Sequence, residues 1–115
     1  MTLRPKGIVF DADDVPALAD FWHRATGYET KSSNTWFAHL IPEAVGLKHI
    51  FIIKVPEGKT AKNRCHVDFD TDDRTAEVER LVSAGATKVA DHTLHGFTWT
   101  VMQDPEGNEF CVSDG

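Results

Sequence analysis

The sequence repeats itself, because residues 7–27 are similar to residues 66–86 at an offset of 59 positions. Asp13-Asp14 in the first stretch corresponds to Asp72-Asp73 in the second, and matching phenylalanine, aspartate and alanine residues flank both pairs. Each stretch predicts a strand, an acidic helix cap, an amphipathic helix and a terminating glycine. A repeat of about half the 115 residues indicates two copies of one supersecondary unit.

Each copy is expected to contain one helix and four strands. The helices begin after a cap at Asp13 or Asp14 and at Asp72 or Asp73, and each ends at a glycine. Alternation and turn residues place the strands near residues 6–12, 28–31, 34–40, 48–55, 64–71, 87–90, 97–103 and 108–113. Each unit therefore has the predicted order βαβββ.

Length and composition point to one domain over residues 1–115, with units at about 3–55 and 62–114. The net charge of −6 argues against a nucleic-acid partner and against binding to an anionic membrane. No apolar stretch is long enough to span a bilayer. Two cysteines do not make a disulfide framework, so a reduced, cytoplasmic protein is expected.

The segment Asp104-Pro105-Glu106-Gly107-Asn108-Glu109-Phe110 predicts a type I turn between the last two strands. Together with the paired βαβββ units and the stretch 62–68, it resembles the vicinal oxygen chelate superfamily, and in particular its glyoxalase-like subset. That superfamily includes glyoxalase I, bleomycin-resistance proteins and extradiol dioxygenases. The resemblance implies an α+β fold whose curled mixed sheets surround a cavity, and it implies a homodimer. It does not decide function, because the fold hosts isomerases, dioxygenases, thiol transferases and non-catalytic drug binders.

The resemblance also implies four places for metal ligands, on the first and last strands of each unit. In this chain those places fall on Gly7, at or beside Ile53, on His66 and on Cys111. Glycine has no side chain and isoleucine has no donor atom, so we expect neither a bound metal nor another cofactor. The alternative is a divalent metal held by His66 and Cys111, completed by a second chain or by a substrate.

Strand alternation predicts which side chains face the cavity. Val67 and Phe69 are expected to pack under the helix, so His66 and Asp68 face inward. For residues 50–53 both faces are apolar, and periodicity does not choose between them. The expected ligand-binding residues are Trp36, Phe51, Ile53, Trp99 and Met102, with His66, Asp68, Glu109 and Cys111 as the inward polar groups.

Three functions agree with these residues. The first, which the missing metal ligands favour, is a metal-free domain that binds a small, partly apolar organic molecule. The second is a lyase, isomerase or dioxygenase type of enzyme, metal-free or with a degenerate metal site, in which His66 acts with Glu109 or Asp68 as acid and base. The third is an interaction domain with a vestigial cavity. Cys111 is expected to be an inert thiol, since no basic neighbour that would form a thiolate is evident.

Overall fold

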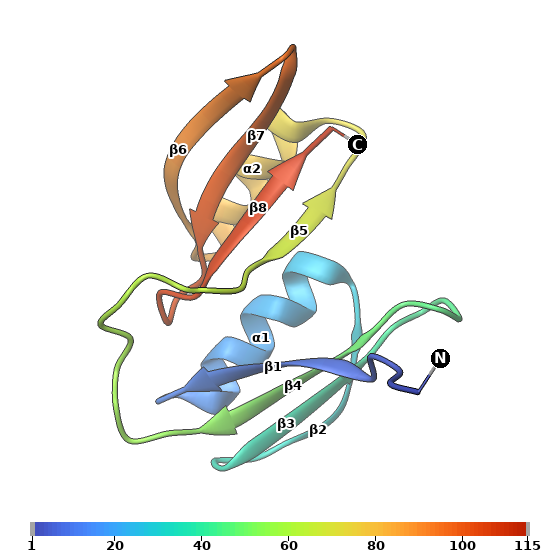
Figure 1. The fold of residues 1–115 in the computed structure, drawn as a ribbon. Coiled ribbons are helices and arrows are strands. Elements are labelled where there is room, and N and C mark those ends of the chain that lie inside the picture. The colour runs from blue at the N-terminus through green and yellow to red at the C-terminus, as the bar shows by residue number, and fades with distance from the viewer. Residues whose placement is uncertain (1, 115) are drawn as a thin grey trace. The chain divides into compact units, whose positions relative to one another are not determined.

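The computed structural model describes residues 2–114. The chain divides between Gly58 and Lys59 into two compact units, unit 1 and unit 2, which Figure 1 colours from blue to green and from yellow to red. Within the described residues each unit has one helix and four strands. The two halves thus repeat the same element order, as the offset of 59 predicts, and the expected α+β class is confirmed.

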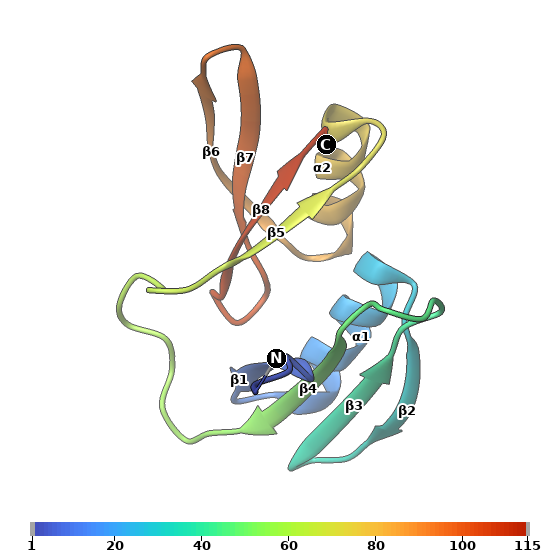
Figure 2. The same ribbon diagram turned by 45° about the vertical axis from the view of Figure 1, so that its right-hand side comes forward.

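Unit 1 is a four-stranded mixed sheet covered on one face by a helix (Figure 2). Its elements are β1 (Gly7–Ala12), α1 (Val15–Thr26), β2 (Glu29–Ser33), β3 (Phe37–Ile41) and β4 (His49–Lys54). The strand order is β1-β4-β3-β2, in which β1 and β4 are parallel and the other neighbours are antiparallel. The helix therefore crosses the sheet from β1 at one edge to β2 at the other, and β3 and β4 fill the places between these two strands.

Unit 2 repeats this topology with the strand order β5-β8-β7-β6. Its elements are β5 (Val67–Asp70), α2 (Arg74–Ala84), β6 (Thr87–Leu94), β7 (Phe97–Gln103) and β8 (Glu109–Ser113). The sequence predicts a strand over residues 87–90, but β6 extends four residues further, to Leu94. The strand continues because only the two-residue turn His95-Gly96, with both φ angles positive, separates β6 from β7.

Both helices are capped by the second aspartate of the paired acids, and each begins at the next residue. The side chain of Asp14 accepts a hydrogen bond from the backbone N–H of Ala17, and Asp73 accepts one from Ala76, each at 3.1 Å. Gly27 then closes α1 in the left-handed conformation, with φ of 78°. None of the helices in the described part of the chain is long and apolar enough to cross a membrane.

The core of each unit lies between its helix and one face of its sheet. In unit 1, Ile50 and Ile52 are fully buried, and the ring of Phe10 stacks on Trp22 at 4.9 Å between centroids. Phe51 and Ile53 therefore lie on the opposite face, which we call the open face, and this settles the question that periodicity left undecided. In unit 2, Phe110 and Val112 are buried.

The turn before β8 has the hydrogen bonds that its sequence predicts. The N–H of Gly107 donates to the carbonyl oxygen of Asp104 at 2.9 Å. One carboxylate oxygen of Asp104 accepts from the N–H groups of Glu106 and Asn108, also at 2.9 Å. Asp104 is only 3% exposed, so the buried carboxylate is satisfied by its own turn and fixes the entry into β8.

Candidate functional site

A pocket of about 310 Å³ lies on the open face of the unit 2 sheet. It is lined by His66, Asp68, Phe69, Phe97, Trp99, Cys111 and Ser113. These residues come from β5, β8 and β7, which are neighbours in the sheet, and from the residue just before β5. Together these residues give the pocket one polar end and one aromatic wall. Phe69 is half-buried, and its ring also meets Phe110 edge to face at 5.9 Å.

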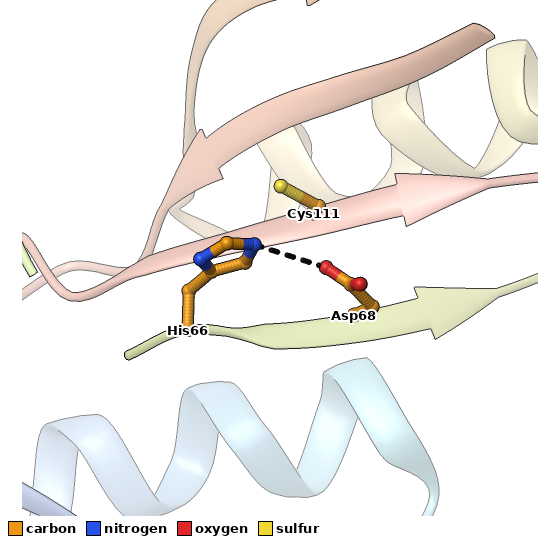
Figure 3. A group of neighbouring side chains, drawn as sticks. All are labelled: His66, Asp68 and Cys111. Atoms are coloured by element: carbon orange, nitrogen blue, oxygen red, sulfur yellow. Dashed lines mark ion pairs between the residues drawn. The ribbon is translucent and has the colours of Figure 1, made fainter. Parts of the chain in front are cut away.

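The polar end consists of His66, Asp68 and Cys111, which Figure 3 shows pointing toward one another. The Nε2 atom of His66 lies 3.1 Å from a carboxylate oxygen of Asp68. Asp68 and Cys111 are paired directly across the parallel β5–β8 ladder. One potential donor atom from each residue lies within 4.8 Å of the others. Alternation along the chain thus places two of the expected catalytic candidates, His66 and Asp68, side by side, and strand pairing adds Cys111.

Cys111 forms the buried floor of this cluster, with 7% of its surface exposed. Burial raises the pKa of its thiol, and the nearby carboxylate of Asp68 raises it further. The thiol is therefore protonated at neutral pH, which makes it a poor nucleophile and a poor metal ligand until it loses that proton. This agrees with the expectation of an inert thiol.

The aromatic wall is built on the β6–β7 hairpin. Trp99 stacks against Phe97 at 5.8 Å and against His92 at 5.4 Å between ring centroids. His92 is paired with Trp99 across the ladder. The predicted strand over residues 87–90 is too short to include His92, which lies on β6. The signal that could have found it is the His95-Gly96 dipeptide, which favours a tight hairpin and hence a longer β6.

Two expected pocket residues lie elsewhere in unit 2. Met102 is fully buried in the core, on the other face of β7 from Trp99, since residues three apart on a strand point in opposite directions. Glu109 does not line the pocket: its carboxylate accepts hydrogen bonds from Lys59 and from the N–H of Asn63, both at 3.0 Å. Burial acts to raise the pKa of Glu109, but these hydrogen bonds outweigh it and the pKa is lowered. Neither residue therefore lines this pocket, although both were expected to bind the ligand.

Trp36, Phe51 and Ile53 belong to unit 1. Trp36 lies in the turn between β2 and β3 rather than on a strand, and 69% of its surface is exposed. Phe51 and Ile53 lie on the open face of β4, where Ile53 is 42% exposed. The expectation that these three residues share one ligand with Trp99 stays a prediction.

Sheet register corrects the position of one metal-ligand place. Cys111 is paired with Asp68 in unit 2, and the equivalent pair in unit 1 is Phe51 with Val9, so the place falls on Phe51 rather than at or beside Ile53. At Gly7, a Cβ atom would lie 2.6 Å from the Phe51 ring and 2.9 Å from the carbonyl oxygen of His49. Neither place of unit 1 can offer a ligand, so the four-place metal site of the superfamily does not fit this chain.

The comparisons with known proteins agree with this fold. A model of the glyoxalase-like domain matches residues 7–113. Similar solved structures include a glyoxalase/bleomycin resistance protein/dioxygenase family enzyme from Burkholderia phytofirmans, with 21% identity over 96% of this chain and 97% of that one, and a TM-score of 0.76. A comparison with curated protein sequences gives no significant match.

Two other structures were solved with bound molecules. A fosfomycin resistance protein from Listeria monocytogenes, in complex with Mn(II) and 1S,2S-dihydroxypropylphosphonic acid, has 12% identity over all of this chain and 91% of that one, with a TM-score of 0.81. The bleomycin-binding protein of Streptomyces verticillus, in complex with copper(II)-bleomycin, has 21% identity over all of this chain and 98% of that one, with a TM-score of 0.68. At these identities the likeness establishes the fold alone.

Proposed function

The chain belongs to the glyoxalase-like domain family of the vicinal oxygen chelate superfamily, and we propose that it binds a small, partly apolar organic molecule without a metal. The observation that carries this proposal is the unit 2 pocket, where Trp99 and Phe97 face a polar end made by His66 and Asp68. A cavity of about 310 Å³ is within the range that small organic ligands occupy.

The two ends of the pocket have different roles in ligand recognition. The Trp99 and Phe97 rings offer apolar area at little cost in side-chain entropy, which suits a flat ligand. The His66–Asp68 pair offers a directional donor and acceptor, so it would orient the ligand rather than hold most of its binding energy. The bleomycin-binding protein and the Listeria protein show that this fold accommodates small organic molecules in those two proteins.

A thermal-shift screen of small organic compounds, followed by tryptophan fluorescence, tests the proposal. Trp99→Ala should weaken the binding of any hit by about 5- to 150-fold, the usual range for losing one buried aromatic contact. The control is Val89→Ala, since Val89 is 53% exposed on β6 and does not line the pocket. Equal affinities for Trp99→Ala and the parent protein would contradict the proposal.

His66→Ala should change selectivity more than affinity, because it removes a directional polar group from the pocket. Ligands that carry a hydrogen-bonding group should lose most of their preference over their apolar analogues. Competition between matched pairs of compounds measures this preference. A uniform loss of affinity for every compound would instead assign His66 a packing role.

The His66–Asp68–Cys111 cluster favours one second candidate, an enzyme on the same fold. Glu109 is engaged with Lys59, so the acid and base would be His66 and Asp68. His66, Asp68 and Cys111 could hold a metal only if the Cys111 thiol loses its proton and the contact between His66 and Asp68 breaks. We therefore propose that purified protein carries much less than one divalent ion per chain. Elemental analysis that found one metal per chain, lost in His66→Ala, would favour the enzyme.

We also propose that the protein is cytoplasmic, because neither of its two cysteines forms a disulfide. Cys65 is exposed and Cys111 is buried, and both are free. Free thiols persist in reducing compartments. Fractionation of the native host, with detection of the chain in the soluble cytoplasmic fraction, tests this.

A further inference from the structure

Residues 59–65 lead into β5 and belong to no helix or strand. In the described part of the chain, the hydrogen bonds that this segment makes with the unit 2 sheet all end on Glu109. Within the same described residues, the segment takes part in no backbone-to-backbone hydrogen bond outside the ladders. One residue of β8 therefore attaches the segment to the sheet.

Glu109 attaches the segment through three hydrogen bonds. One carboxylate oxygen accepts from Nζ of Lys59 and the other accepts from the backbone N–H of Asn63, each at 3.0 Å. The backbone oxygen of Glu109 also accepts from the side-chain amide of Asn63 at 3.4 Å. The side chains of Glu109 and Lys59 are only 13% and 20% exposed, so salt and water screen this ion pair weakly. We call Glu109, Lys59 and Asn63 the anchor.

The anchor lies where the ladder of unit 2 is one pair shorter than the ladder of unit 1. In unit 1 the parallel ladder includes Gly7, which is paired with His49. His66 is equivalent to Gly7, but in unit 2 the pairing begins only at the next residue, Val67. His66 therefore lies just outside the ladder, and Figure 3 shows it at the start of the β5 ribbon.

The contact between His66 and Asp68 is too exposed to hold the imidazole by itself. Their side chains are 44% and 77% exposed, and exposed pairs of this kind contribute little to stability. The backbone that carries His66 is attached at Val67 on one side and, three residues earlier, at Asn63 on the other. The position of the imidazole in the pocket thus depends on the anchor.

Glu109 lies on the face of the sheet that carries the pocket. It comes two residues before Cys111 on β8, and Phe110 between them is buried on the opposite face. Glu109 does not itself line the pocket, because its carboxylate is engaged by Lys59 and Asn63. The route from Glu109 to a bound ligand therefore runs through the chain between Asn63 and His66.

We propose that Glu109 is a positioning residue for the unit 2 pocket, which fixes the chain at Asn63 and thereby holds the His66 imidazole against Asp68. Loss of the anchor frees residues 59–66 to move, while β5 and β8 stay paired from Val67 onward. The imidazole then samples several orientations, and the polar end of the pocket loses its fixed donor and acceptor. The effect on ligand selectivity rests on the proposed function, whereas the effect on His66 itself does not.

The ring-nitrogen resonances of histidine, recorded on the full chain without ligand at about pH 8, test the positioning directly. In the parent protein His66 should show one tautomer, with Nε2–H donating to Asp68. In Glu109→Ala the His66 signals should move toward values averaged between the two tautomers. His66→Gln identifies these signals among the six histidines. Unchanged His66 signals in Glu109→Ala would overturn the proposal.

Three further variants separate positioning from a general loss of stability. Asp73→Ala removes the cap of α2 and should destabilise the same unit, yet leave the His66 signals at their parent values. Glu109→Gln keeps an oxygen that can accept from the Asn63 N–H, so it should restore much of the parent spectrum. Lys59→Met breaks the ion pair with less risk to the fold, and should move the signals in the same direction as Glu109→Ala. Equal shifts in Asp73→Ala and Glu109→Ala would make Glu109 purely structural and overturn the proposal.

A ligand found in the thermal-shift screen extends the test to recognition. Glu109→Ala should lower the preference for a hydrogen-bonding ligand over its apolar analogue by about 2- to 10-fold, the usual value of one hydrogen bond. The double variant Glu109→Ala/His66→Ala should lose no more preference than His66→Ala alone, because both changes remove the same contact. Additive losses in the double variant would overturn the proposal. If the screen gives no ligand, the proposed function fails, while the His66 resonances still decide the role of Glu109.

Discussion

Gly7 and His66 occupy equivalent places in the two units, and one aromatic ring explains their difference. In unit 1 the Phe51 ring fills the space that a side chain at position 7 would need. In unit 2 the place equivalent to Phe51 holds the much smaller Cys111, which leaves room for the His66 imidazole and for a pocket. The size of the residue at this place therefore decides the difference: phenylalanine in unit 1 gives an aromatic stack, and cysteine in unit 2 leaves a polar cluster with a pocket.

Gly7→Ala should lower the free energy of unfolding by about 1–3 kcal/mol, the usual cost of overpacking. The collision includes the carbonyl oxygen of His49, so movement of the Phe51 ring alone cannot relieve it. Urea denaturation measures the change. Gly58→Ala is the control, because nothing lies within 4 Å of its Cβ position, and it should stay within about 0.5 kcal/mol of the parent. Equal stability of the two variants would refute the steric explanation.

Glu109→Gln should lower the free energy of unfolding by about 1–2 kcal/mol at neutral pH, because the carboxylate accepts hydrogen bonds from Lys59 and Asn63. The pKa of Glu109 is lowered in the folded state, so its contribution is complete above the unfolded pKa and is lost as the pH falls through the folded pKa. Denaturation from about pH 7 to about pH 3 should show the two proteins converge. Glu57→Gln, at an exposed position of the connector, should differ little from the parent at any pH.

At the scale of elements, the sequence was sufficient to predict the repeat and the order βαβββ, because caps, turns and apolar periodicity are local signals. It could not separate Asp13 from Asp14, because both can accept a hydrogen bond and only the backbone angles decide which one caps the helix.

Contacts between strands were harder to predict than the strands themselves. The His39–His49 bond depends on the register of β3 against β4 across seven intervening residues, which no local pattern reports. The pairing of Asp68 with Cys111 likewise joins strands from opposite ends of unit 2. Met102 is different, because the three-residue spacing from Trp99 was sufficient to exclude it from the pocket face.

The cap of α2 can be tested with two adjacent aspartates. Asp73→Ala should lower the free energy of unfolding by about 1 kcal/mol, since it leaves the N–H of Ala76 without its side-chain acceptor. Asp72→Ala removes the same charge one residue earlier, outside the cap, and should have a smaller effect. Thermal or urea unfolding of the pair gives the difference. A larger loss for Asp72→Ala would move the cap back by one residue.

At the scale of the molecule, large apolar side chains remain exposed in both units. Trp36, Leu47 and Leu94 are 69%, 53% and 60% exposed, and the open face of unit 1 adds others. A domain of 115 residues buries a limited fraction of its surface on folding, and association is a common way to bury more. We therefore expect a homodimer in solution. Light scattering at micromolar concentration should give twice the chain mass of 12.8 kDa.

The dimer prediction can be made specific with Trp36, because this side chain lies in an exposed turn and contributes no part of a core. If Trp36 packs in the interface, Trp36→Ser should raise the dimer dissociation constant by about tenfold or more, since buried tryptophans are frequent hot spots. The midpoint of unfolding of the diluted monomer should not change, which separates association from folding. Val45→Ser, at a fully exposed position of unit 1, is the matched control. A mass of 12.8 kDa for the parent protein at micromolar concentration would rule out the dimer.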